Sequence, residues 1–97
     1  MLLYEEHMVT TVWFRNMVHV TLTTDYLTFT TLWIKLKTIP VKAIREVALH
    51  KALLSRKIIV TYSDTHGLPH YAEWTTRRFD QWNQVFHQAG IPATRKQ

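Results

Sequence analysis

The chain has 97 residues, 46% of them hydrophobic, which suits one compact domain with a single core. It contains no cysteine, which excludes disulfides and thiolate metal sites, and no apolar run approaches the roughly 20 residues of a membrane span. The net charge is +5. The first eight residues, MLLYEEHM, carry acids where a secretory signal would carry bases, so we expect a cytoplasmic protein.

The positive charge is concentrated in one quarter of the chain. Between Lys35 and Lys57 lie seven bases and one acid, Glu46, whereas the remainder holds five bases and six acids. Such a stretch attracts nucleic acid, anionic lipid or an acidic protein, and it also serves as a plain solvated surface. The basic residues of this stretch are Lys35, Lys37, Lys42, Arg45, Lys51, Arg56 and Lys57.

The first 39 residues predict four antiparallel strands in a meander, because β-branched and aromatic side chains are frequent and apolar residues alternate with polar ones. Thr24 and Asp25 mark a turn, since an aspartate side chain bonds to amides two residues further on. In the fourth strand, Ile34 and Leu36 are expected on the face opposite the lysines. The four stretches are Met8–Phe14, Met17–Thr23, Leu27–Thr31 and Trp33–Ile39.

Residues 40–57 fit two patterns. As a helix they form an amphipathic stripe that begins after Pro40, and their Ala, Leu, Lys, Arg and Glu favour helix. As a strand, Ile44, Val47 and Leu49 pack inward with a bulge between them, and the strand ends in a loop. Periodicity alone leaves both structures open.

The second half of the chain predicts two more strands and a tail. Arg56–Ser63 alternates as a strand, and His70–Thr75 forms a last strand after a loop of turn formers at residues 64–69. Ala93–Gln97 is polar and basic, and we expect it to fray. The chain is therefore divided into one domain, residues 1–92, and a basic tail, residues 93–97.

Residues 75–92 contain the best-marked element, a helix on which apolar residues recur at intervals of three and four. Thr75 or Thr76 is expected to cap its start, because a hydroxyl there accepts a hydrogen bond from an amide without an intrahelical partner. Gly90, with a proline two residues later, predicts the stop. The apolar face consists of Phe79, Trp82, Val85, Phe86 and Ala89.

Three local motifs accompany this order of elements. They are Val20–Phe29, in which a Thr-Asp turn precedes a Leu-x-Phe pair, Ile39-Pro40 followed by Ile44 and Val47, and Phe79-x-x-Trp82 followed by Phe86, Gly90 and Ile91. Together they resemble the pleckstrin-homology-like superfamily, in particular GRAM and bacterial PH-like domains, over roughly residues 8–92. The resemblance implies a mainly β (α+β) fold, a partly open antiparallel barrel of six or seven strands closed by one C-terminal helix.

The resemblance also bears on function. Phosphoinositide-binding PH domains place several bases in and beside the first hairpin loop, where this chain offers only Arg15. Bacterial PH-like domains often serve as protein-interaction or assembly modules, and that implication fits better. Core and turn positions carry the resemblance, so it concerns the fold more than the function.

The histidines and carboxylates give weaker indications. His66 and His70 flank a Gly-Leu-Pro turn near Asp64, and imidazole with carboxylate can bind zinc or nickel, but an ordinary hairpin loop is the favoured interpretation. Asp64 or Glu73 with a histidine could form an acid–base pair, which chance also produces on a sheet. The other imidazoles are expected to be solvated or satisfied separately. They are His7, His19, His50 and His87.

The leading hypothesis is a non-enzymatic binding module with no metal and no cofactor, because no nucleophile elbow, P-loop or glycine fingerprint is present. It would recognise a protein partner, or its own copies as a homodimer or higher oligomer, through a strand edge or the surface around Trp33 and the seven bases, since Trp and Arg are enriched at interfaces. The alternative is electrostatic binding of anionic phospholipid headgroups or nucleic acid through Lys35–Lys57.

Overall fold

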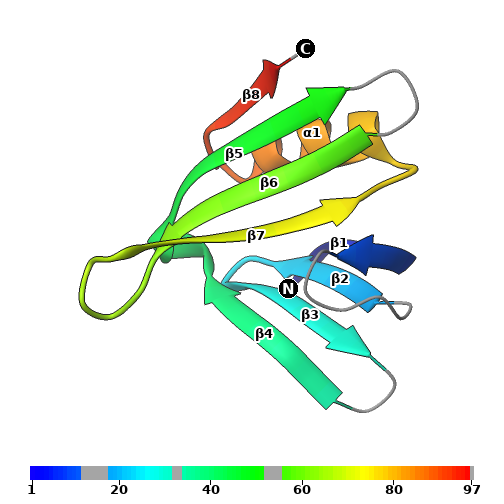
Figure 1. Cartoon of the computed structure of the whole chain (residues 1–97). Coiled ribbons are helices and arrows are strands. Elements are labelled where there is room, and N and C mark those ends of the chain that lie inside the picture. Colours follow the sequence, from blue (N-terminus) through cyan, green and yellow to red (C-terminus); the bar gives the residue numbers. More distant parts are fainter. Residues whose placement is uncertain (12–17, 32–33, 52–55, 97) are drawn as a thin grey trace.

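The structure, a computed structural model, describes residues 1–11, 18–31, 34–51 and 56–96. These residues form a mainly β fold, with one α-helix near the C-terminus (Figure 1). The strand order in the sheet is β4-β3-β2-β1-β7-β6-β5-β8. In chain order the elements are β1 (Leu2–Thr11), β2 (Val18–Thr23), β3 (Tyr26–Thr31), β4 (Ile34–Pro40), the 3-10 turn η1 (Val41–Ala43), β5 (Ile44–Lys51), β6 (Arg56–Ser63), β7 (Pro69–Thr75), α1 (Phe79–Gln88) and β8 (Ala93–Lys96).

The predicted four-strand meander is confirmed, because β1, β2, β3 and β4 pair antiparallel in succession. The first strand was placed too late: β1 begins at Leu2, six residues before the predicted Met8, and residues 12–14 lie outside the described part of the chain. In β2 the alternation is as expected, with Val18, Val20 and Leu22 fully buried.

Ile34 departs from the expected pattern, since its side chain is 61% exposed whereas Leu36 packs partly against the core. The cause lies in the pairing of β4 with β3. The register shifts between Phe29 and Thr30, and β4 is the outermost strand on its side of the sheet. The irregularity breaks the period of two, and the beginning of an edge strand lies beyond the reach of the core.

The ambiguous stretch is a strand where the structure describes it. A short 3-10 turn is followed by β5, in which Ile44, Val47 and Leu49 are buried. The register with β6 shifts between Ile44 and Glu46, which is the bulge that the strand interpretation required. Helix propensity was outweighed by the antiparallel pairing with β6, and the helix interpretation is wrong for residues 44–51.

The tail is also a strand. Ala93–Lys96 forms β8, which pairs in parallel with β5, so the sheet has eight strands where six or seven were expected. A hydrogen bond from the Val47 amide to the Pro92 carbonyl, 2.9 Å long, holds the chain against β5 as it leaves the helix. The expectation of a frayed tail is therefore wrong for these four residues.

The helix packs against the face of the sheet that lies behind β5 and β6 in Figure 1. Its residues Phe79, Trp82 and Phe86 are buried, as the apolar stripe predicted. Trp82 lies at the centre of an aromatic cluster, with its ring centroid 5.2 Å from that of Trp74 and 5.6 Å from that of Phe86. No helix in the described ranges is long and apolar enough to cross a membrane.

Candidate functional site

The seven bases of the Lys35–Lys57 stretch divide into separate groups. Lys35 and Lys37 lie on the edge strand β4, Lys42 lies in the turn η1, and Arg45 lies near the beginning of β5. Lys51, Arg56 and Lys57 lie at the other end of the β5–β6 hairpin, about 23 Å from Ile44 at the rise of an extended strand. Trp33 lies outside the described residues.

Two of these bases contact neighbouring side chains. The Lys37 ammonium lies over the ring of Tyr62, 5.8 Å from its centroid, and Arg45 Nε donates a hydrogen bond to Ser63 Oγ. The side chains of Lys51, Arg56 and Lys57, like those of Lys35 and Lys42, make no hydrogen bond or ion pair with another described residue. We call Lys51, Arg56 and Lys57 the hairpin-end bases.

Asp64 organises the turn between β6 and β7. Its carboxylate accepts hydrogen bonds from the backbone amides of His66 and Leu68, at 2.8 and 2.9 Å, and contacts His70 Nε2 at 2.8 Å. The His70 contact, and after it the Leu68 amide, lowers the pKa of Asp64 below its ordinary value of 3.8. His66 contributes only its backbone, so this cluster closes a turn, and within the described ranges no three His, Asp or Glu residues could together hold a metal ion.

A different carboxylate, Glu6 on β1, is buried and reaches the segment that leads into α1. It accepts hydrogen bonds from the Thr76 hydroxyl at 2.5 Å and from Trp82 Nε1 at 2.8 Å, both on Oε1, and from the Arg77 amide at 3.1 Å on Oε2. Only 5% of Glu6 is exposed. A buried charge is tolerated when donors satisfy it, and here three neutral donors do so.

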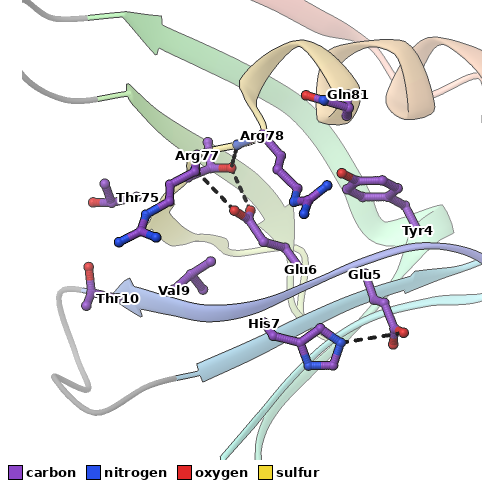
Figure 2. Close-up of a pocket in the computed structure, with 11 residues that line it drawn as sticks. Tyr4, Glu5, Glu6, His7, Val9, Thr10, Thr75, Arg77, Arg78 and Gln81 are labelled. Atoms are coloured by element: carbon purple, nitrogen blue, oxygen red, sulfur yellow. Dashed lines mark hydrogen bonds and ion pairs between the residues drawn. The ribbon is translucent and has the colours of Figure 1, made fainter.

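We call Glu6 and its three hydrogen-bond donors the Glu6 anchor. It borders a groove of about 780 Å³ between β1 and the entry to α1 (Figure 2). Tyr4, Glu5, His7 and Thr10 contribute from the side of β1. The opposite wall comes from the end of β7 and the first turn of α1. Its residues are Thr75, Thr76, Arg77, Arg78 and Gln81.

The groove lies where the sheet separates. β1 pairs with β2 between Leu2 and Val9, but it pairs with β7 only at Thr10 and Thr11. Along Leu2–Val9 no described strand pairs with the other side of β1. This stretch of β1 therefore has a free strand edge, with alternate backbone amides and carbonyls directed toward the groove.

The wall opposite this edge carries two free cations. Arg77 and Arg78 are exposed, and their guanidinium groups make no hydrogen bond or ion pair with another described residue. Figure 2 shows the two side chains diverging, Arg77 on the side of Thr75 and Arg78 on the side of Tyr4. The hydroxyl of Tyr4, which lines the groove from β1 as Glu6 does, is buried without a hydrogen-bond partner in the described part of the chain.

None of the predicted site residues that the structure describes lines this groove. Glu6 was missed because its three partners lie 70 or more positions away. One signal was present: Glu6 is two residues from Tyr4, on the face of β1 that packs against Trp82. An acid at an inward position of a strand has to find donors.

The comparisons with known proteins assign no function to this site. No protein-family model matches this chain, and no curated protein matches it. The function is therefore inferred from the arrangement of β1, Glu6 and the two arginines.

Proposed function

We propose that this chain is a non-enzymatic binding module of pleckstrin-homology-like architecture that takes up an extended segment of a protein partner beside β1. Two antiparallel meanders followed by a C-terminal helix support the architecture. One observation carries the function: among the described strands, β1 is paired on one side only between Leu2 and Val9, and its other side borders a groove. Strand addition to such an edge is a common mode of peptide recognition.

The size and charge of the groove define the partner segment. Leu2–Val9 spans about 23 Å as an extended strand, which accommodates about six to eight residues of a peptide. Backbone hydrogen bonds to β1 would supply affinity irrespective of sequence. Arg77 and Arg78 on the opposite wall add a preference for Asp or Glu, because a guanidinium binds a carboxylate through two parallel hydrogen bonds.

A separate partner fits better than a second copy of this chain. The two outermost strands of the sheet are β4, with Lys35 and Lys37, and β8, whose sequence contains Arg95 and Lys96. Pairing β4 or β8 of two copies would bring like charges opposite one another, and basic strands offered to the groove would meet the two arginines. We therefore expect a monomer, and light scattering that gives the mass of a dimer would contradict this part of the proposal.

The test uses two synthetic eight-residue peptides, one alternating valine with glutamate and the other alternating valine with lysine. Each is titrated into ¹⁵N-labelled protein while amide shifts and hydrogen exchange are followed. The glutamate peptide should shift and protect amides of Leu2–Val9, and the lysine peptide should bind at least tenfold more weakly. No perturbation of β1 by either peptide would refute strand addition.

A pair of variants assigns the charge preference. Arg77→Gln with Arg78→Gln keeps the Arg77 backbone amide that binds Glu6 but removes both guanidinium groups, so binding of the glutamate peptide should fall at least tenfold. Lys51→Gln with Lys57→Gln, which removes two bases outside the groove, is the matched control and should change the affinity less than twofold. Equal losses in both variants would indicate a general charge effect.

A second candidate function rests on the hairpin-end bases. Lys51 and Arg56 are directly opposite across β5 and β6, and like charges in that position repel one another. An anionic ligand would relieve the repulsion, which favours phosphate groups of lipid or nucleic acid as the ligand. Phosphatidylserine vesicles and a single-stranded oligonucleotide, each tested from low to high salt, distinguish the two sources, and no binding at low salt excludes both.

A further inference from the structure

The outer face of the β1–β2 hairpin brings together two histidines that are 12 residues apart in the sequence. His7 Nδ1 lies 3.0 Å from His19 Nε2, and the two rings meet edge to face with centroids 4.1 Å apart. Glu5 and Glu6 pair with Thr21 and Val20 in regular antiparallel register, and one further step of this register brings His7 to His19. These imidazoles were expected to be solvated or satisfied separately, whereas the pairing of the two strands brings them into contact.

A carboxylate stands behind the pair. Glu5 Oε1 lies 3.6 Å from His7 Nε2, the ring nitrogen that does not face His19. In metal sites, a histidine that binds the ion through one nitrogen usually directs the other toward a carboxylate or carbonyl, which fixes the ring and makes it a better ligand. Glu5, His7 and His19 therefore have the order of an outer carboxylate followed by two ligands.

We propose that His7 Nδ1 and His19 Nε2 form a binding site for one divalent transition-metal ion, such as Ni²⁺, Cu²⁺ or Zn²⁺. Two nitrogens 3.0 Å apart can each lie about 2.1 Å from an ion placed beside the line that joins them, at an angle of about 90°. That angle separates neighbouring ligands in square-planar and octahedral complexes, the geometries that Cu²⁺ and Ni²⁺ adopt.

The remaining ligands are water. In the described residues no third His, Asp or Glu joins the pair, so the ion keeps several exchangeable positions. His7 and Glu5 are about half exposed, which leaves room for these waters and allows the rings to turn toward the ion. The site is consequently of moderate affinity and reversible by a chelator.

The other described histidines lack this arrangement. His70 is held by Asp64 and stacks on Tyr62, and His66 lies in the turn with its backbone amide bound to the same carboxylate. His87 is exposed on α1, and His50 lies on β5 opposite Lys57. The His7–His19 pair is thus the place in the described part of the chain where two imidazole nitrogens already converge.

The contact between the two nitrogens also shows what must change when the ion binds. One of the two nitrogens carries the shared proton in the free protein, and the metal ion needs a lone pair on both. The ring that carries this proton must hold it on its other nitrogen instead, a change of tautomer that frees both lone pairs without a net release of a proton. Calorimetry of Ni²⁺ binding measures the stoichiometry and the affinity directly.

The experiment titrates nickel chloride into the full chain at neutral pH. We expect one Ni²⁺ per chain, at least tenfold weaker binding in His7→Gln and in His19→Gln, and reversal by EDTA. His66→Gln and His87→Gln are the matched controls and should bind within twofold of the original protein. Unchanged affinity in His19→Gln, or the absence of one-to-one binding, would overturn the proposal.

Two features keep this test independent of the peptide proposal. His19 does not line the groove, so His19→Gln leaves peptide binding intact, and Arg77→Gln with Arg78→Gln leaves nickel binding intact. A measurement on the unaltered protein needs no variant: paramagnetic Cu²⁺ should broaden amide signals around His7 and His19 first. Broadening that begins at His70 or His87 would contradict the assignment.

Discussion

The two ends of α1 are held in different ways. At the C-terminal end, Gly90 adopts a left-handed backbone with φ of 73°, and the amides of Gly90 and Ile91 bond to the carbonyls of His87 and Phe86. This is a Schellman motif, and all its partners lie within five residues. At the N-terminal end Arg78 makes no side-chain cap, and the chain is held instead by Glu6, from a strand more than 70 residues earlier.

The two ends differ in how much their contacts stabilise the fold and in whether the local sequence predicts them. The stop at Gly90 depends on the local backbone alone, so replacing this glycine strains the backbone at one residue. The Glu6 anchor joins β1, the end of β7 and Trp82 in the core, so its loss leaves three buried or half-buried donors without an acceptor. We expect the distant contact to matter more for stability than the local one.

Glu6→Ala should have the largest effect. Removing the carboxylate should lower the free energy of unfolding by about 3 kcal/mol, since hydrogen bonds to a charged group are strong and their donors would stay buried. Urea denaturation followed by tryptophan fluorescence measures the change. Glu6→Gln, which keeps an acceptor oxygen, should lose less, and Glu5→Ala on the exposed face should change stability by under about 0.5 kcal/mol.

Thr76→Val tests one arm of the anchor with little change in side-chain shape. The Thr76 hydroxyl donates to Glu6 and accepts from the Arg78 amide at 2.8 Å, and both bonds are lost in valine. The free energy of unfolding should fall by about 2 kcal/mol, measured again by urea denaturation. The control Thr75→Val, at the exposed neighbouring residue, should change it by close to zero. A loss in Thr76→Val no larger than in Thr75→Val would mean that the anchor does not hold the helix.

Gly90→Ala tests the local end. A Cβ at Gly90 would meet no atom within 4 Å, so the cost is backbone strain alone, about 1 kcal/mol. Thermal unfolding measures it, with Gln88→Ala as a helical control that should be neutral or slightly stabilising. A loss larger than that of Glu6→Ala would reverse the comparison.

Asp64 provides the smallest test, a local carboxylate on an exposed turn. Its lowered pKa means that its contribution to stability is present above pH 3.8 and is lost as the pH falls through the folded-state pKa. An NMR titration of the Asp64 carboxyl carbon should give a midpoint below 3.8, and His70→Ala should raise it. His66→Ala, which keeps the backbone donor, should leave the midpoint unchanged. A midpoint that is also unchanged in His70→Ala would contradict the assigned cause.

These contacts show how much of the site was accessible from the sequence. The Asp64 turn and the Gly90 stop were anticipated, because their partners are neighbours in the chain. Residue type and spacing are enough for such motifs. The groove, the free edge of β1 and the His7–His19 pair were not anticipated, because each depends on which strands lie next to β1. The spatial division of the predicted basic stretch was not anticipated for the same reason, since bases close together in the sequence lie at opposite ends of a hairpin.

The sequence by itself determined the alternation of β2, the extent of β6, the apolar stripe of α1 and the stop at Gly90, since these follow from local periodicity and backbone preference. Only the tertiary structure decided that residues 44–51 are a strand, that the tail becomes β8 and that Glu6 is buried. The reason is physical: pairing and burial take their free energy from groups far apart in the chain, and that free energy outweighs the small preferences that single residues carry.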